Sequence, residues 1–513
     1  MSQSTRLLLG LPHSVPCEDH VPAKACQTPP VSQLLPLAPL PVEVPIPTGT
    51  TVILDEGAKF LDRDLLTGGS PWRLLRLPGG SRAVAERWVN GGAVQVGEER
   101  FARTLVQQGL LHPLFRAAPD VDDVDVVVPV RDDVEALRSL LHSLRGLHVT
   151  VVDDASVSGD DVAACANHYG ADLVRLDVNR GPGGARNAGV RATKRPYLWF
   201  IDVDVSLDNA RDVLTRLRAH FDDPLEGAVA PRIRGTHGSS VRDRFEELFS
   251  PLDMGERSAL VLPNSIVPYV PSACLMARRS CLGSGFDDTL RVGEDVDLVW
   301  RLHDHGWLVR YVADVTVTHR ARDSWRGWWT QRIRYGQSSS ELAKRHGTRL
   351  APFRADTWTL LTWTSALLGK PMVGLRIIDA ARDQLRERML TTTDNADNVA
   401  GELVGRGMVR AGPLMARAVV RTFGLVIVLS ALHPKLRRRA LTLFVVGTAY
   451  RWRSTRLRLA DIPLGVADDV AYGAGVMSGA VRSRTLGALK PHITKSTLGL
   501  RNVLGLKPGA GSL

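Results

Sequence analysis

The hydrophobic and polar residues between positions 121 and 203 alternate between short apolar runs and amphipathic stretches. Apolar runs typical of buried strands occupy 125–130, 149–154, 172–176 and 197–203. Helical stretches are predicted between them, at 134–144, 161–168 and 184–192. Strands that alternate with helices at this spacing predict a parallel α/β sheet, whose ligands bind beyond the carboxyl ends of the strands.

A smaller α+β unit is predicted before this domain, at residues 45–117. Its pattern predicts strands at 51–54 and 72–77 and helices at 81–89 and 98–108, the second closed by Gly109. A unit of this size folds alone only marginally. Residues 1–44 are rich in Pro, Ser and Val without a helical period, and we predict a flexible leader there. The α/β domain is predicted to span 120–340.

The remaining residues, 341–513, are predicted to be helical, with turns near 369–371 and 433–434. The chain's net charge is +11, but residues 355–513 alone carry 23 Lys and Arg against 10 Asp and Glu, or +13. The other 354 residues therefore carry −2. No nucleic-acid motif accompanies this basic excess, so we expect no nucleic acid as a partner.

Apolar runs interrupt the basic region at 422–434 and 440–450, and both are shorter than the 18 residues expected of a spanning helix. Because the basic cluster Lys435–Arg439 adjoins them, the pattern favours helices lying on an anionic membrane face. The alternative is buried helices of a soluble domain with a solvated basic face. The first interpretation predicts a cytoplasmic protein at the inner face of the cell membrane.

The cysteines and the N-terminus agree with that compartment. The five cysteines, at positions 17, 26, 165, 274 and 281, lack metal-ligand spacing and are read as reduced thiols. The apolar cluster Leu7–Leu9 is cut off by Gly10 and Pro12, so we expect no cleaved signal peptide.

Two pairs of acidic residues fall at strand ends where a ligand would bind. Asp202 and Asp204 lie two positions apart at the end of an apolar strand, so both side chains point to the same side. Their like charges repel, and a divalent cation such as Mg²⁺ or Mn²⁺ would relieve that repulsion. Asp153 and Asp154 end another predicted strand, which follows the strand with Pro129 along the chain. The alternative for Asp202 and Asp204 is a solvated strand end.

Two further motifs extend this chemistry. Glu294 and Asp295 open a predicted helix, where a general base could stand, although the helix dipole alone also favours acids there. The segment 179–187, which includes Gly184 and Arg186, is a glycine-rich turn entering a helix. Such a turn can hold a diphosphate with its N–H groups, or be glycine-rich only because it is tight.

An aromatic and polar cluster follows the α/β domain. Trp325, Trp328 and Trp329 precede Gln331, Arg334 and Tyr335. Aromatic faces suit sugar rings and Arg can bind phosphate, while core packing is the alternative for each tryptophan.

From about 122 to 340, the chain resembles an inverting family 2 glycosyltransferase of the GT-A fold. The resemblance rests on motifs in the family's order: "VVVPVRDD", "VVDDAS", "NRGPGGARNAGV", "FIDVDV", "GFDDTLRVGEDVDLVWRLHDHGW" and "QRIRY". It implies an α/β fold with a Rossmann-like mixed sheet, a UDP-sugar donor and a divalent cation.

The resemblance also implies roles for individual residues. Asp295 would be the base that activates the acceptor hydroxyl, with Glu294 beside it. Asp202, Asp204 and His319 would bind the metal. The other nucleotide-sugar contacts would come from Pro129, Asp153, Asp154, Gly184, Arg186, Asp202, Gln331, Arg334 and Tyr335. Tyr335 stands where chain-extending members have Trp, which leaves processivity undecided.

The N-terminal unit resembles the peptide-recognition domain, similar to the pyrroloquinoline-quinone chaperone, that holds ribosomal precursor peptides. This resemblance rests on "LTGGSPWRLLRLPGG" and "FARTLVQQGLLHP", and a generic winged-helix-like accessory domain is the alternative. Together with the catalytic motifs and the basic C-terminus, it resembles the glycosyltransferase family of the mycofactocin pathway. This implies transfer of glucose from UDP-glucose onto a peptide-derived redox cofactor, extended to a β-1,4-glucan.

Two other functions stay open at this point. One is a cell-envelope glycosyltransferase that acts on a lipid-linked or polysaccharide acceptor. The other is a non-catalytic scaffold that binds sugar nucleotides. The scaffold predicts lost carboxylates, whereas Asp154, Asp202, Asp204 and Asp295 are all present.

Overall fold

A computed structural model describes residues 44–494, except 63, 78, 119, 239, 321–323, 392 and 453–458. The predicted leader, Cys17 and Cys26 lie outside the described residues. The chain divides into two compact units, residues 1–321 and 322–513, and each is described by itself. The predicted boundary at residue 340 therefore stays a prediction.

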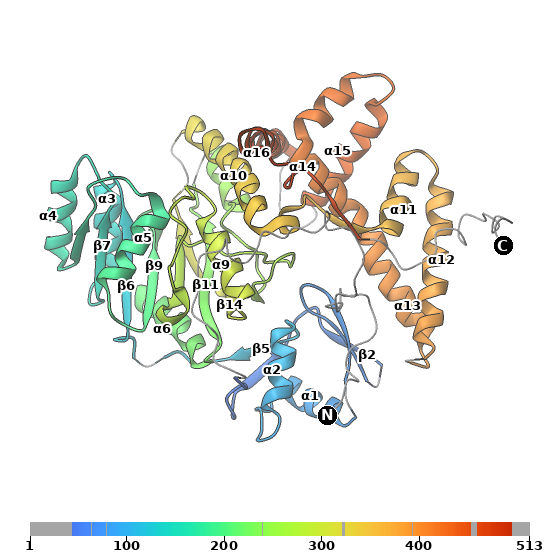
Figure 1. Cartoon of the computed structure of the whole chain (residues 1–513), viewed down its shortest axis with the longest axis horizontal. Helices are drawn as coiled ribbons and strands as arrows, with labels where there is room; N and C mark the ends of the chain where they lie inside the picture. Colours follow the sequence, from blue (N-terminus) through green and yellow to red (C-terminus); the bar gives the residue numbers. More distant parts are fainter. Residues whose placement is uncertain are drawn as a thin grey trace, which may run out of the picture. The chain divides into compact units, whose positions relative to one another are not determined.

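The first unit contains a large mixed sheet (Figure 1). Its strands are β6 (Val124–Val130), β7 (Val149–Asp153), β8 (Asp172–Arg175), β9 (Tyr197–Ile201), β10 (Val205–Ser206), β11 (Glu226–Gly235), β12 (Ala259–Leu260), β13 (Cys274–Arg278) and β14 (Leu308–His319). Within the described chain the order is β10-β14-β11-β13-β9-β6-β7-β8, with β12 also on β14. Strands β9, β6, β7 and β8 are parallel, as predicted. Strand β13 runs antiparallel to β9 and β11, which makes the whole sheet mixed.

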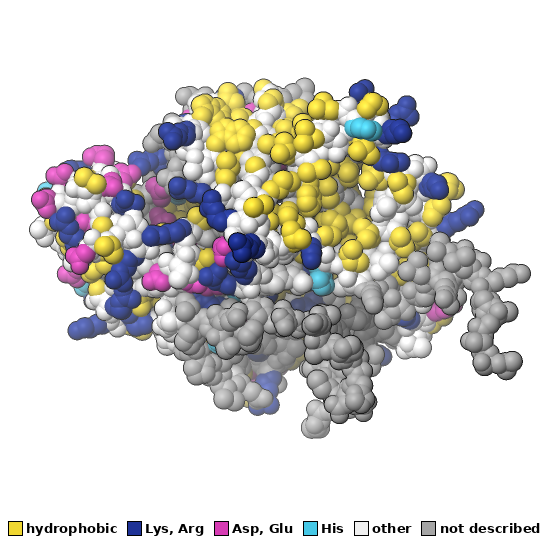
Figure 2. Space-filling model, turned by 45° about the horizontal axis from the view of Figure 1, so that its top comes forward, with side chains coloured by type: hydrophobic (Ala, Val, Ile, Leu, Met, Phe, Trp, Pro, Cys, Tyr) yellow, Lys and Arg dark blue, Asp and Glu magenta, His cyan; other side chains and the backbone are white. Residues whose placement is uncertain are grey.

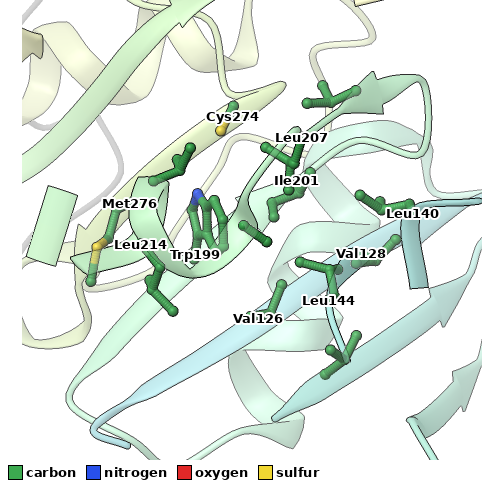
Figure 3. Close-up of a cluster of buried hydrophobic side chains, with 14 of the residues drawn as sticks. Val126, Val128, Leu140, Leu144, Trp199, Ile201, Leu207, Leu214, Cys274 and Met276 are labelled. Atoms are coloured by element: carbon green, nitrogen blue, oxygen red, sulfur yellow. The ribbon is translucent and has the colours of Figure 1, made fainter. Parts of the chain in front are cut away.

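Helices connect these strands. They are α3 (Val134–Ser143), α4 (Gly159–Tyr169), α5 (Gly181–Ala192), α6 (Ala210–Ala219), η2 (His220–Asp222), α7 (Val241–Phe249), α8 (Arg279–Leu282) and α9 (Glu294–Asp304). Asp133 caps α3 by accepting a hydrogen bond from the N–H of Ala136. The core between sheet and helices includes Val126, Leu140, Trp199 and Ile201 (Figure 3).

Helix α5 lies unusually close to the sheet. A Cβ at Gly189 would stand 2.3 Å from Cγ1 of Val127 on β6, so only glycine fits there. This close packing fixes the helix that contains Arg186, and with it the position of the candidate site.

The N-terminal part of the first unit has two small sheets and two helices. Its elements are β1 (Thr51–Leu54), β2 (Lys59–Asp62), β3 (Leu65–Gly68), β4 (Arg73–Arg76), α1 (Ser81–Val89), α2 (Glu99–Gln107) and β5 (Leu111–Leu114). The strand orders are β2-β3-β4 and β1-β5. Its core, around Trp88, continues into Leu225, Leu260 and Leu308 of the α/β part. The predicted unit therefore shares its core with its neighbour.

A buried ion pair joins these two parts. The guanidinium of Arg103 on α2 donates to both carboxylate oxygens of Asp223, at 2.8 and 2.6 Å, and also to the carbonyl of Val44 at 2.9 Å. Arg103 is 5% exposed and Asp223 0%. Such a pair contributes little net stability, but removing one partner leaves the other charge buried and unpaired.

The second unit is mainly helical, as predicted. Its elements are α10 (Trp325–His346), η3 (Gly347–Leu350), β15 (Arg354–Asp356), α11 (Thr357–Leu367), α12 (Pro371–Met389), α13 (Ala396–Val404), η4 (Gly405–Val409), α14 (Arg410–Leu432), α15 (Arg437–Trp452), η5 (Leu459–Asp461), α16 (Ile462–Ser483) and β16 (His492–Thr494). Both predicted turns are confirmed, between α11 and α12 and between α14 and α15. Glycines let α10 and α16 touch, since a Cβ at Gly336 would stand 2.2 Å from the carbonyl oxygen of Tyr472.

Replacing Arg103 with Met should lower the free energy of unfolding by about 3–5 kcal/mol, because Asp223 would stay buried without its partner. Urea denaturation followed by tryptophan fluorescence measures this. The matched control is Arg138→Met, which removes an exposed pair with Glu135 at 3.6 Å and should change stability by less than about 1 kcal/mol. Equal effects of the two substitutions would contradict the assigned role of the buried pair.

Candidate active site

Arg186 is the centre of a group of acidic side chains that come from distant parts of the first unit. Its side chain donates to Asp202 at 2.6 Å and to Glu294 at 2.9 Å. Arg186 is 1% exposed. Burial by itself would lower the pKa of Arg186, but the charges of Asp202 and Glu294 outweigh it and raise the pKa. The end of β9 and the start of α9 are thus joined through one guanidinium.

Asp202 and Asp204 lie close enough to repel each other, as their spacing predicts. Burial raises the pKa of Asp202, Arg186 opposes this, and the charge of Asp204 raises it further. The side chain of Asp202 is still 28% exposed. Asp204 contacts His319 at the end of β14, with 3.2 Å between Oδ2 and Nε2. The structure therefore brings all three predicted metal ligands to one edge of the sheet.

These donors suit a hard divalent cation. Carboxylate oxygens and an imidazole nitrogen are ligands that Mn²⁺ accepts, and a cation would relieve the repulsion between Asp202 and Asp204. Among the described residues, no three or more His, Cys, Asp or Glu side chains stand together as a complete metal site. Oxygens of a bound diphosphate and water could supply the rest of the shell.

Glu294 and Asp295 stand at the first turn of α9, with Glu294 turned toward Arg186. Burial raises the pKa of Glu294 to about 7, and the charge of Asp295 adds to this while Arg186 opposes it. Burial also raises the pKa of Asp295, against the N–H of Val296 and the charge of Arg186. Asp295 accepts from the N–H of Val296 at 2.8 Å and from that of Ser272 at 3.3 Å. These two contacts fix the carboxylate without neutralising it.

Asp153 and Asp154 at the end of β7 are both buried. Asp154 accepts hydrogen bonds from the N–H groups of Arg180, at 2.6 Å, and Gly181, at 2.9 Å, and so orders the glycine-rich turn. Oδ1 of Asp153 accepts from the N–H of Ser156 at 2.8 Å, while its Oδ2 has no hydrogen-bond partner within the described part of the chain and lies 3.7 Å from Nε of Arg175. The chain's own residues thus contact both carboxylates, and the predicted contacts of Asp153 and Asp154 with a nucleotide stay predictions.

Pro129 and Gly184 have structural explanations in the same region. Pro129 is half-buried in β6 and aligned with Val152 of β7. A Cβ at Gly184 would stand 2.5 Å from the Cβ of Arg180, so glycine is needed for the turn itself. Their predicted contacts with a nucleotide sugar stay predictions.

Gln331, Arg334 and Tyr335 lie on α10 and are described with the second unit. The side-chain amide of Gln331 donates to the hydroxyl of Tyr335 at 3.1 Å, and Arg334 is exposed. Of the tryptophans before them, Trp328 is 1% exposed and packs in the core, whereas Trp325 is 47% and Trp329 38% exposed. The core interpretation is confirmed for Trp328 alone.

Arg186 makes contacts that its motif alone does not reveal. Its side chain is buried between two carboxylates, and its predicted contact with a nucleotide sugar stays a prediction. Its partner Glu294 lies 108 residues further along the chain. The sequence signal for an ion pair between Arg186 and Glu294 is weak. It consists of one arginine on the buried face of a helix and of acidic residues elsewhere in the chain. Ser272, whose N–H fixes Asp295, carried no signal at all.

Comparisons with known proteins agree with this geometry. Residues 125–285 match the family model described as glycosyl transferase family 2. The pre-mycofactocin glycosyltransferase of Mycobacterium tuberculosis is 36% identical over 473 residues, which are 87% of this chain and 98% of the relative. The poly-beta-1,6-N-acetyl-D-glucosamine synthase of Staphylococcus aureus is 27% identical over 176 residues, 34% of this chain and 42% of the relative.

Solved structures give a more distant likeness. A mannosyltransferase from Pyrobaculum calidifontis in complex with GDP-Man and Mn²⁺ has a TM-score of 0.39 at 17% identity, over 71% of this chain and 89% of its own. Glucosyl-3-phosphoglycerate synthase from Mycobacterium tuberculosis has a TM-score of 0.31 at 21% identity, over 44% of this chain and 80% of its own. Scores this low add no argument of their own.

The family 2 match covers the strands that hold Asp153, Asp154, Asp202 and Asp204, and the full-length relative extends the similarity through α9 and the helical second unit. The chain belongs to the glycosyltransferases of family 2 with a GT-A fold and, among them, to the pre-mycofactocin glycosyltransferase family.

Proposed function

We propose that this enzyme transfers a hexose, with inversion, from a UDP-sugar onto the peptide-derived redox cofactor of mycofactocin biosynthesis. The observation that carries the proposal is the convergence of Asp202, Glu294 and Asp295 on Arg186 in a chain of this family. The donor is proposed to be UDP-glucose, and the product a β-1,4-linked oligosaccharide.

Asp295 is the proposed general base. The N–H groups of Val296 and Ser272 hold its carboxylate in place. In a single displacement, the acceptor hydroxyl attacks the anomeric carbon, Asp295 takes the hydroxyl proton, and the bond from the anomeric carbon to the diphosphate breaks. Glu294 beside it accepts a hydrogen bond from Arg186 at 2.9 Å and is proposed to help position the acceptor.

The donor side is proposed to lie at the ends of β7 and β9. The second oxygen of Asp153 would accept a hydrogen bond from the base or ribose, while Asp154 holds the turn 180–181 in shape. Asp202, Asp204 and His319 would hold Mg²⁺ or Mn²⁺. A cation bound there would offset the negative charge that develops on the leaving diphosphate.

The N-terminal part of the first unit is proposed to hold the peptide-derived acceptor. In the described chain, β2 and β4 are the outer strands of their small sheet, and an extended peptide can add to such an edge. Because this part shares a core with Leu225, Leu260 and Leu308, it would hold the acceptor at a fixed place relative to the α/β domain.

The alternative acceptor is a lipid-linked or polysaccharide chain of the cell envelope. A basic second unit suits an enzyme at the membrane, and the poly-beta-1,6-N-acetyl-D-glucosamine synthase is similar over 176 residues. In either case we propose a cytoplasmic site of action, and contact with the inner face of the membrane stays a prediction.

Mass spectrometry of reaction products distinguishes the acceptors. The purified full-length chain is given UDP-glucose, UDP-galactose or UDP-N-acetylglucosamine, each with a peptide-derived mycofactocin precursor or a lipid-linked sugar. We expect the precursor to gain the mass of one or more hexoses. Transfer only to the lipid-linked sugar would support the alternative. Calorimetric UDP binding without transfer to either acceptor would support the non-catalytic scaffold that binds sugar nucleotides.

The substitution Asp295→Asn should lower kcat by roughly 10²–10⁴-fold, because the acceptor proton loses its base, while the Kd for UDP stays within about twofold. Single-turnover transfer assays and calorimetry measure the two quantities. The matched control is Asp304→Asn, at the exposed end of the same helix, which should leave both unchanged. A near-normal rate for Asp295→Asn would eliminate this residue as the base.

Glu294 should make stability depend on pH. Its pKa rises from 4.5 in the unfolded chain to about 7 in the fold, so the folded protein binds this proton more tightly. The contribution is complete below about pH 4.5 and is lost as the pH rises through 7. Urea unfolding of the metal-free protein across this range should show a loss about 3 kcal/mol larger for wild type than for Glu294→Gln. Identical pH profiles would show that Glu294 keeps an ordinary pKa.

A further inference from the structure

The distal part of the α14–α15 hairpin carries a concentration of exposed apolar side chains. We define the hairpin tip as residues 424–446. The described residues include thirty exposed large hydrophobic side chains, and eight of them lie in these 23 positions. They are Leu425, Val426, Val428, Leu429, Leu432, Leu436, Leu441 and Val445. Figure 2 shows hydrophobic side chains gathered over a broad area, with lysine and arginine at its edge.

The base of the hairpin is attached to the rest of the second unit by partly buried ion pairs. Arg417 on α14 pairs with Asp469 of α16, and Arg451 on α15 pairs with Asp468 at 2.9 Å. Helix α14 is then interrupted at Phe423, whose φ of −115° and ψ of 27° are not helical. The tip begins immediately after this interruption, so the anchored and exposed parts of the hairpin are distinct.

The tip is too short to cross a membrane. Residues 396–432 together are long and apolar enough to do so by length and composition, but one third of their most apolar window is buried in the protein. In α14, the nine residues after Phe423 lie beyond the ion pair of Arg417. At 1.5 Å per residue they extend roughly 13 Å. A bilayer's hydrocarbon core is about 30 Å thick. The tip has the reach of a segment that lies in the interface.

The charge of the tip identifies its partner. Residues 424–446 contain four Lys and Arg and no Asp or Glu. All four, Lys435, Arg437, Arg438 and Arg439, are exposed at the turn beside the apolar side chains. A second copy of the chain packed on the same surface would bring the two sets of four positive charges together. Anionic phospholipid headgroups instead complement the charges while the acyl boundary accepts the apolar side chains.

We propose that the hairpin tip docks the enzyme on the surface of an anionic phospholipid bilayer. The apolar side chains enter the boundary between headgroups and acyl chains, and Lys435 and Arg437–Arg439 bind the lipid phosphates. Docking of this kind is independent of sugar transfer, so its failure would leave the proposed reaction untouched.

Vesicle flotation of the full-length protein tests the proposal. The vesicles are made either of phosphatidylcholine alone or of equal parts phosphatidylglycerol and phosphatidylcholine. We expect the protein to float with the anionic vesicles and to stay largely at the bottom with the neutral ones. Arg437→Gln, Arg438→Gln and Arg439→Gln together should lower the partition coefficient roughly 100-fold. Leu425→Ser, Leu429→Ser and Leu432→Ser together should lower it at least tenfold.

Two matched variants control for charge and exposure. Arg138→Gln, Arg191→Gln and Arg211→Gln together remove three exposed arginines of the first unit, and Val96→Ser removes an apolar side chain that is 85% exposed. Both should float like wild type, and circular dichroism should show all variants folded. Equal binding to neutral and anionic vesicles, or binding unchanged by both tip variants, would overturn the proposal. A dimer that forms without lipid and dissociates in the leucine variant would also overturn it, because the surface would then be an interface between copies of the chain.

Discussion

The paired, buried guanidinium of Arg186 is the feature on which the candidate active site depends. It joins Asp202, at the end of β9, to Glu294, at the start of α9, although the two lie 92 positions apart in the sequence. Three carboxylates near one another would otherwise repel, and one buried arginine offsets enough of that repulsion to keep them together. The repulsion between Asp202 and Asp204 remains. This pair lies on the partly exposed side of the group, where a cation and a diphosphate could reach it.

Buried or partly buried arginine–carboxylate pairs join parts of a unit at two other places in the described chain. Arg103 and Asp223 join the N-terminal part to the α/β domain, and Arg417 and Arg451 join the α14–α15 hairpin to α16. Because such pairs contribute little net stability, their value lies in geometry: an arginine fork tolerates few orientations of its partner. The N-terminal part, the carboxylate group and the α14–α15 hairpin are thus each attached to a neighbouring element by a directional contact.

Local patterns predicted elements better than links between them. The helix Ser81–Val89 and the strand Thr51–Leu54 lie at their predicted positions, because their apolar patterns are contained within the segment. Strands β2 (KFLD), β3 (LLTG) and β5 (LHPL) escaped prediction because their apolar runs are shorter than the TVIL of β1. Asp202, Asp204 and Asp295 could be found from their positions at element ends. The burial of Arg186 could not be predicted, because it depends on Glu294. Whether α14 could cross a membrane depends on where the helix is anchored and not on the length of its apolar run.

Calorimetric titration of UDP, with and without Mn²⁺, into wild type and Asp204→Asn tests the carboxylate group most directly. We expect Mn²⁺ to tighten UDP binding to the wild type by at least tenfold, and most of this gain to be lost in the variant. We also expect the melting temperature of the variant to stay close to that of the wild type, since Asp204 lies outside the buried pairs of Arg186 with Asp202 and Glu294. Equal affinity and equal Mn²⁺ dependence in the two proteins would contradict the assignment of the donor site to this edge of the sheet.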